Sequence, residues 1–349
     1  MTALTTPELA KLDPVSTVNA PRQVRASGMA VVGSIPIGEA FANRHGLVAR
    51  DPAIEDSWAV HDWNGPEWFV LAVDAAKTVE VVQSIAARRT GPLRILQLSR
   101  GLDPSGATLG EAVASQLGSR LATYAVLAGG LSAQDLRSMT PTQATLACRD
   151  AEALAALGEL LVDCDLHLRR DLDVRAVEWS AAFAEVMALL LGLTEGAELP
   201  TGTRAWTLRA ASDEIVAMSE REQVLEMAAF GGHQGPWAIE LPSAMLHETP
   251  SRRLGRLLGR GFTLDDAVVH LVEGDTVYGQ RSRIRTDVPA LATLRGAMSR
   301  GITSMCPGLA ALADFAANAS STRELWERLL HRSIEMPRQA NANEGGPAS

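Results

Sequence analysis

The chain contains very little lysine, little aromatic side chain and little cysteine. Only Lys11 and Lys77 are lysines, so 30 of the 32 basic residues in this 349-residue chain are arginines. Arginine stays protonated in proteins and is a poor proton carrier. The chain therefore has almost no position at which a lysine could transfer a proton in a reaction. Aspartate and glutamate number 41, which gives a formal net charge of −9. This acidic balance is not typical of a nucleic-acid-binding protein or of a polybasic membrane anchor.

The cysteines and the apolar segments indicate the cellular setting. Cys148, Cys164 and Cys306 show neither Cys-x-x-Cys pairing nor the ligand spacing of a zinc site. The polar, proline-containing first 25 residues lack the charged start and apolar core of a secretory signal. The most apolar helix candidate, 181–193, contains Glu185 and is expected to be too short to span a bilayer. We therefore expect a soluble, cytoplasmic protein without a metal and without a membrane partner.

Two kinds of hydrophobic pattern divide the chain, between an expected flexible arm (1–25) and an expected flexible tail (336–349). In residues 26–170 short apolar runs alternate with helical stretches, which predicts an α/β fold with a mostly parallel, Rossmann-like sheet. The expected strands are 29–32, 68–73, 94–98, 123–128, 143–147 and 166–169. Residues 171–335 show long segments of 3.6-residue period, which predict an all-α domain for substrate binding or dimerisation.

The first expected strand is followed by a glycine turn into a helix. A dinucleotide-binding turn has the pattern Gly-x-Gly-x-x-Gly, and Gly33 and Gly38 occupy its first and third positions. The second position holds Ile35, whose β-branched side chain is expected to crowd the approach of a pyrophosphate. Pro36 removes an amide donor, and Glu39 adds negative charge near the same helix end. The turn is thus compatible with dinucleotide binding or with a purely structural role.

The segment after this turn gives weak support for a bound ribose. An acidic residue is expected about 20 residues past the glycines, at the end of a second strand. Glu55 and Asp56 are the available acids, but no clear strand surrounds them. Trp58, Trp63 and Trp68 lie nearby and are expected to pack over the sheet edge rather than to stack on a base.

Several short motifs occur in an order that resembles the NAD(P)-dependent glycerol-3-phosphate dehydrogenases. Each is weak alone, but their shared order extends over roughly residues 29–317. The segments that carry the resemblance are Leu98-Ser99-Arg100-Gly101, Gly129-Gly130-Leu131-Ser132, Val177-Glu178-Trp179, Gly202-Thr203-Arg204-Ala205, Arg252-Arg253-Leu254-Gly255 and Val272-Glu273-Gly274. The resemblance implies a Rossmann-like domain followed by a helical domain, with NAD or NADP as cofactor. It also implies that Gly33, Gly38 and Glu273 lie at the cofactor. The segment around Glu273 is also expected to form a turn, whatever the function.

The departures from this family lie at the residues that the resemblance associates with catalysis. The family's helix lysine, which handles the alcohol proton, matches Ala184, and a methyl group cannot exchange a proton. The neighbouring asparagine matches Glu185. Two further lysines match Arg100 and Arg204, and Arg252 is the arginine left from a phosphate-binding Arg-Asn-Arg sequence. These changes keep positive charge and remove the matching proton carrier.

Other residues are possible replacements. Glu185 is a possible base, and its alternative is to be solvated or paired with an arginine. His233, in a glycine-rich loop, is a second possible base because histidine as a residue type exchanges protons under physiological conditions, and its alternative is simple exposure. Arg100, Arg204 and Arg252 either line a pocket for a small phosphorylated ligand or form structural ion pairs.

Two interpretations follow. The main one is a degenerate, non-catalytic relative that acts as a binding, regulatory or partner subunit, as a homodimer or paired with a paralogue. The alternative is a divergent NAD(P)-dependent oxidoreductase acting on glycerol 3-phosphate, dihydroxyacetone phosphate or a similar small anionic polyol. Likeness of fold alone does not choose between them.

Overall fold

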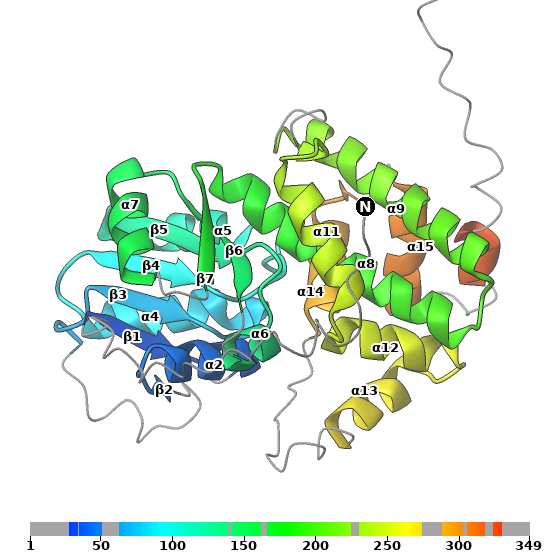
Figure 1. The fold of residues 1–349 in the computed structure, drawn as a ribbon, viewed down its shortest axis with the longest axis horizontal. Helices are drawn as coiled ribbons and strands as arrows, with labels where there is room; N and C mark the ends of the chain where they lie inside the picture. Colours follow the sequence, from blue (N-terminus) through cyan, green and yellow to red (C-terminus); the bar gives the residue numbers. More distant parts are fainter. Residues whose placement is uncertain are drawn as a thin grey trace, which may run out of the picture.

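The computed structural model of the chain describes residues 28–33, 35–50, 63–138, 141–161, 166–224, 230–273, 288–302, 306–317 and 324–329. A sheet covered by helices lies beside an assembly of helices, and the two parts meet along one side (Figure 1). The expected arm and tail, together with Glu55, Asp56, Trp58 and Cys164, lie outside the described residues.

A seven-stranded sheet forms the first part. Its order is β2 (Ala49–Arg50), β1 (Met29–Val32), β3 (Trp68–Leu71), β4 (Leu93–Gln97), β5 (Leu121–Ala128), β6 (Thr142–Cys148) and β7 (Leu166–Asp171). Neighbouring strands are parallel except β5 and β6, which run antiparallel. The predicted mostly parallel sheet is confirmed, and each expected strand overlaps an observed one. Strand β2 was not predicted, because a strand of two residues is too short to show a hydrophobic pattern.

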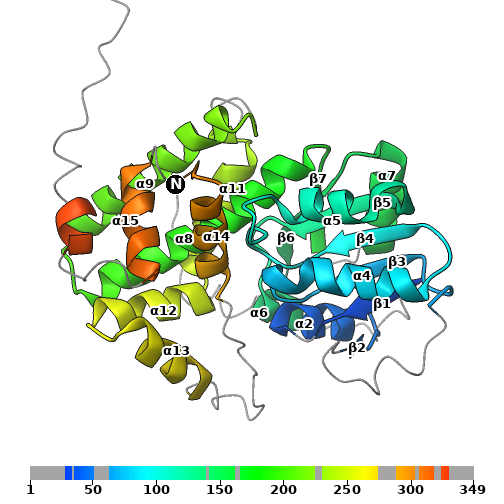
Figure 2. The ribbon, with the colours of Figure 1, turned by 180° about the vertical axis from the view of Figure 1, so that it is seen from behind.

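Helices cover both faces of this sheet (Figure 2). They are α2 (Pro36–Arg44), α4 (Thr78–Arg88), α5 (Leu109–Leu117), α6 (Ala133–Ser138) and α7 (Ala151–Leu161). Two separate apolar clusters fill the space between sheet and helices, one on each face. Because both faces are buried, a strand such as β3, Trp-Phe-Val-Leu, is apolar throughout rather than alternating. Trp63 stacks on Phe69 in this core, with ring centroids 6.1 Å apart.

Helix α8 (Val174–Gly196) is the centre of the second part. The other helices there are α9 (Thr201–Arg221), α11 (Pro236–Leu246), α12 (Pro250–Gly259), α13 (Leu264–Glu273), α14 (Pro289–Ser299) and α15 (Pro307–Ala316). Asp173 caps the start of α8 by accepting a hydrogen bond from the Ala176 amide. Helices α9, α11, α12 and α14 all pack against α8. The predicted all-helical character of this half is confirmed, although α11 was not expected from the sequence.

Helix α8 is longer than the sequence pattern indicated. It has 23 residues and is long and apolar enough to cross a membrane, so the expectation that it was too short was wrong. Its most apolar window is nevertheless fully buried inside the structure. Buried Glu178 and Glu185 interrupt the apolar sequence, and both have polar partners in the fold. These features are those of a central core helix.

Four glycines bring α8 and α12 into backbone contact. Gly192 and Gly196 on α8 face Gly255 and Gly259 on α12, each pair being spaced by one helical turn. A Cβ added to Gly255 would stand 2.0 Å from the Leu189 carbonyl oxygen, and one added to Gly192 would stand 1.9 Å from the Arg252 carbonyl oxygen. Because no side chain fits between them, these glycines fix the distance and the register of the two helices.

We predict that Gly255→Ala destabilises the protein by at least about 1–3 kcal/mol, because the new methyl group meets backbone on a neighbouring helix. Gly202→Ala on α9 is the matched control, since an added Cβ there has no neighbour within 4 Å. That variant should be neutral or up to about 1 kcal/mol more stable. Urea unfolding of both variants measures the difference. Equal stability of the two variants would contradict the backbone contact.

Candidate functional site

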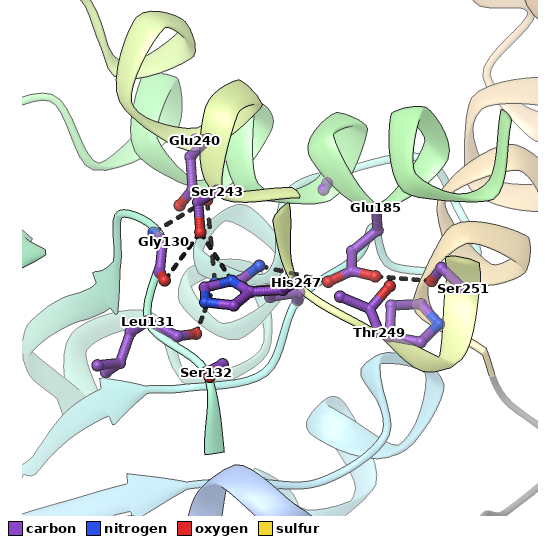
Figure 3. A network of polar contacts seen from close by, with 12 residues as sticks. Gly130, Leu131, Ser132, Glu185, Glu240, Ser243, His247, Thr249 and Ser251 are labelled. Carbon is purple, nitrogen blue, oxygen red and sulfur yellow. Dashed lines mark hydrogen bonds and ion pairs between the residues drawn. The ribbon is translucent and has the colours of Figure 1, made fainter. Parts of the chain in front are cut away.

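Polar side chains gather where the loops after β4 and β5 meet α8, α11 and α12 (Figure 3). The carboxyl ends of parallel strands are where ligands bind in open α/β sheets. The loop after β4 supplies Arg100, and the loop after β5 supplies Gly129, Gly130 and Leu131. The helical part supplies acids and hydroxyls to the same place, so this network joins the two parts of the molecule.

Arg100 lies at the centre of the network, with its side chain only 13% exposed. Its Nη1 is 3.3 Å from Glu185 Oε1, and its Nη2 donates to the Leu131 carbonyl at 2.9 Å and lies 3.9 Å from Glu240 Oε2. Burial by itself lowers the pKa of Arg100, but Glu240 and Glu185 outweigh that effect and the pKa is raised. The positive charge is therefore fixed and is balanced from within the protein.

Glu185 is paired with an arginine, which the sequence analysis gave as the alternative to a role as a base. Its Oε1 faces Arg100, and its Oε2 accepts a hydrogen bond from the Ser251 hydroxyl at 2.6 Å. Glu185 is 5% exposed and Ser251 is fully buried. Ser251 lies in the first turn of α12, so the glycine contact between α8 and α12 also sets this bond.

Glu240 of α11 binds the glycine pair that follows β5. Its carboxylate accepts hydrogen bonds from the Gly129 and Gly130 amides and is 1% exposed. Both glycines have positive φ, 84° and 89°, which turns their amides toward the helical part. A Cβ on Gly130 would also stand 2.8 Å from Ser243 Cβ. The sequence motif located the glycines but gave no signal for Glu240.

A line of hydrogen bonds crosses the same interface through His247. The Ser243 hydroxyl donates to the Gly130 carbonyl at 2.9 Å and lies 2.9 Å from His247 Nδ1. His247 Nε2 lies 3.0 Å from Asp135 Oδ2 on α6. Both histidine and aspartate are about a quarter exposed. Sequence analysis missed His247; its only sequence signal is the four-residue spacing from Ser243, which places both on one side of α11.

Glu178, one turn into α8, connects that helix to the sheet part. Its carboxylate accepts hydrogen bonds from the Gly110 amide, at the start of α5, and from the Tyr124 hydroxyl. Burial raises the pKa of Glu178 to about 7, even though these hydrogen bonds act in the opposite direction. The pKa of Tyr124 is also raised, by burial and by Glu178, so the phenol remains a donor.

Several predicted site residues are not brought into the network. His233 is exposed in the loop before α11, and Arg204 lies half-buried on α9 without a described contact to Arg100. Arg252 binds Glu195 and donates to the Met245 and His247 carbonyls. Arg100 and Arg252 thus each have acidic partners inside the protein, which is the structural ion-pair role that the sequence left open for them.

Two predicted positions have a clear structural setting. Ala184 is fully buried in the apolar core of the helical part, so the position that matches the family's lysine carries no polar group. Glu273 is the last residue of α13 rather than part of a turn, and its side chain lies outside the described part of the structure.

The glycine turn after β1 has the tight backbone conformation that its glycines allow. Gly33 has φ 115°, and a Cβ there would stand 1.9 Å from the Ala72 carbonyl oxygen. A Cβ on Gly38 would stand 2.3 Å from Ala72 Cβ, so α2 packs directly on β3. Ile35 is half-buried and packs against the apolar cluster under α2 and α6. Arg137 of α6 donates to the Pro36 carbonyl at 3.4 Å, which places a positive charge beside the turn.

The fold and this polar interface define a Rossmann-like protein with a helical second part. A crystal structure of glycerol-3-phosphate dehydrogenase from Coxiella burnetii superposes with a TM-score of 0.70 at 18% identity, covering 87% of this chain and 98% of that one. This likeness shows the fold. No protein-family model matches the chain.

The sequence is also similar to those of curated proteins. The chain is 24% identical over 248 residues to "glycerol-3-phosphate dehydrogenase [NAD(P)+]" of Shouchella clausii, covering 68% of this chain and 72% of that protein. It is 29% identical over 210 residues to the protein of the same name from Beijerinckia indica, covering 59% of this chain and 62% of that protein. The resemblance to glycerol-3-phosphate dehydrogenases is therefore confirmed. It favours the dehydrogenase interpretation over the non-catalytic one.

The raised pKa of Glu178 predicts a loss of stability as pH rises. Its pKa is about 7 in the folded protein against an ordinary value of 4.5, so the folded state retains a proton that the unfolded state releases between these values. Stability should fall by up to about 3 kcal/mol from pH 4.5 through pH 7 because of this residue. Urea unfolding across this range should show a flatter profile for Glu178→Gln. Glu152→Gln, exposed on α7, is the control and should keep the wild-type profile.

Proposed function

We propose that this protein is a divergent NAD(P)-dependent oxidoreductase that acts on a small hydroxylated substrate such as glycerol 3-phosphate, its ketone dihydroxyacetone phosphate, or a similar anionic polyol. The observation that carries the proposal is the alignment with named dehydrogenases over about two thirds of the chain. The polar network at the carboxyl ends of the parallel strands supports it, because that is where a substrate of this fold binds. We propose the cytoplasm as its location.

The glycine turn would hold the cofactor. Gly33 and Gly38 allow the tight turn and the close packing of α2 that a dinucleotide site needs, and Arg137 adds a positive charge beside it. Packing of Ile35 against the core removes part of the expected obstruction, while Glu39 in the first turn of α2 still opposes a phosphate. A bound nicotinamide would supply or accept the hydride. The remaining chemistry is the transfer of one proton.

Glu185 is the residue that we assign to this proton transfer. It follows Ala184 directly, and it is the side chain on this part of α8 that reaches the network. Ser251 binds one carboxylate oxygen and Arg100 faces the other, so the group is held in one orientation. Arg100 keeps its own proton and would position the acid or polarise a substrate oxygen.

A second candidate function is a non-catalytic binding or regulatory subunit, as a homodimer or paired with a paralogue. Three observations favour it. Ala184 lies in the apolar core, Arg100 is balanced by two carboxylates, and Ile35 replaces the second glycine. In this role the chain would keep its sheet part and its helical part in order to bind another protein.

Cofactor binding separates the two candidates. Titration with NADH and with NADPH, followed by fluorescence and calorimetry, should show saturable binding, and dihydroxyacetone phosphate should then oxidise the bound cofactor. Absence of binding at millimolar cofactor would reject the oxidoreductase and leave the second candidate. Binding of the cofactor without turnover of dihydroxyacetone phosphate or of glycerol 3-phosphate would reject these two substrates and keep a related polyol.

We predict that Ile35→Gly tightens cofactor binding by about tenfold, roughly 1.4 kcal/mol, because it restores the glycine at the pyrophosphate position. Ile37→Gly is the matched control. It lies two residues further along, in α2, and makes a similar partial contact with the core. Equal affinities in the two variants would show that Ile35 does not obstruct the site.

Glu185→Gln is expected to lower turnover by about 10²–10⁴-fold with little effect on cofactor affinity, because the amide cannot exchange the proton. Glu152→Gln should retain full turnover. Retention of activity by Glu185→Gln would assign the residue to structure only.

A further inference from the structure

The loop after β5 presents two successive backbone amides to a single carboxylate. The Gly129 amide donates to Glu240 Oε1, and the Gly130 amide donates to Glu240 Oε2 at 3.2 Å, so each amide binds a different oxygen. Both glycines have positive φ, 84° and 89°. Successive amides that converge in this way form a concave site for an anion. The anion in this site is a side chain of the protein itself, from α11.

The backbone conformation of this loop is set in part by contacts within the sheet part. A Cβ added to Gly129 would stand 2.4 Å from the Thr145 amide nitrogen and 2.8 Å from Thr145 Cβ, so Gly129 packs directly on β6. The Leu131 carbonyl, which follows the glycine pair, accepts a hydrogen bond from Arg100 Nη2 at 2.9 Å. Contacts that do not involve Glu240 therefore help to hold the two amides in place.

Arg100 supplies a positive charge to the same site. Its Nη2 lies 3.9 Å from Glu240 Oε2, and its side chain is only 13% exposed. The two amides and the guanidinium group thus all come from loops at the carboxyl ends of β4 and β5, where ligands bind in open α/β sheets. The occupant comes from α11, more than a hundred residues further along the chain than the glycine pair (Figure 3).

The charges around the site favour a monoanion. Arg100 lies between two buried carboxylates, because Glu185 Oε1 is 3.3 Å from its Nη1 on the side away from Glu240 Oε2. Without Glu240, the charge of Arg100 would still be balanced by Glu185. Another carboxylate in the place of Glu240 would reproduce the present charges, whereas a phosphate dianion would add a further negative charge to a buried site, which is unfavourable. The group that suits this site is therefore a carboxylate rather than a phosphate.

We infer that the Gly129 and Gly130 amides and Arg100 form a binding site for the carboxylate of a small molecule, and that Glu240 occupies this site in its place. A group that belongs to the same chain acts at an effective concentration of millimolar or more. Glu240 therefore competes with any free carboxylate, and a ligand binds here only by displacing it. The inference does not rest on the proposed oxidoreductase activity, because it involves neither a cofactor nor turnover.

Glu240→Ala removes the occupant and leaves the two amides and Arg100 in place. Acetate is the probe, because it contains the same atoms that the substitution removes, the Cγ carbon and the carboxylate. Small molecules enter buried cavities that substitutions create in this way. In thermal melting of the full chain, acetate should stabilise Glu240→Ala relative to an equal concentration of chloride. Its apparent affinity should be at least tenfold higher for this variant than for the wild-type protein.

Two further probes test the chemistry of the site. Acetamide has nearly the shape of acetate but no charge, and it should bind Glu240→Ala at least tenfold more weakly than acetate does. Inorganic phosphate should also bind this variant more weakly than acetate, because it brings the additional negative charge. Binding of acetamide or of phosphate as tight as that of acetate would contradict the assignment of the site to a carboxylate.

Arg100→Gln, combined with Glu240→Ala, should lower the affinity for acetate at least tenfold, because it removes the positive charge from the site. Glu152→Ala removes an exposed carboxylate of α7 and should respond to acetate as the wild-type protein does. Circular dichroism establishes whether each variant is folded. An equal response to acetate in folded Glu240→Ala and in the wild-type protein would overturn the inference. If Glu240→Ala is unfolded in chloride, failure of acetate to restore its native spectrum would also overturn it.

Discussion

The backbone contact between α8 and α12 is the constraint on which the rest of the structure depends. Without side chains at four glycines, the two helices approach until carbonyl groups of each occupy the space that a Cβ would need. This contact places Ser251 against Glu185 and Arg252 against Glu195. One side of the interdomain network is therefore set by this helix pair.

The interdomain network is an arrangement of buried charges that satisfy one another. Glu185 and Glu240 are both nearly inaccessible, and each would be costly to bury alone. Arg100 stands between them, Ser251 binds the first, and the amides of the glycine turn after β5 bind the second. Such a network fixes the relative position of the two parts and holds Glu185 in one orientation. The same contacts balance the positive charge of Arg100 within the protein.

The fold could be predicted from the sequence because its elements carry strong local signals. The apolar runs of β1 and β3 to β7 and the glycine turn after β1 are continuous in the chain. Glu185 and Arg100 were found because a family motif pointed to their positions. Glu240 and His247 were not, because their role depends on a contact made more than a hundred residues away with Gly129, Gly130 and Asp135. Local periodicity contains no information on that pairing.

Glu178 and Glu185 are seven residues apart on α8, which separates them by about 10 Å along its axis. The first is anchored to the start of α5 and the second to the loop after β4, so one stiff helix is attached to the sheet part at two points. A body attached at a single point swings about it, whereas a body attached at two can turn only about the line that joins them. Rotation about α8 is opposed in turn by the bonds of Glu240 and His247 with the loop after β5 and with α6, so any opening between the two parts requires buried carboxylates to release their partners.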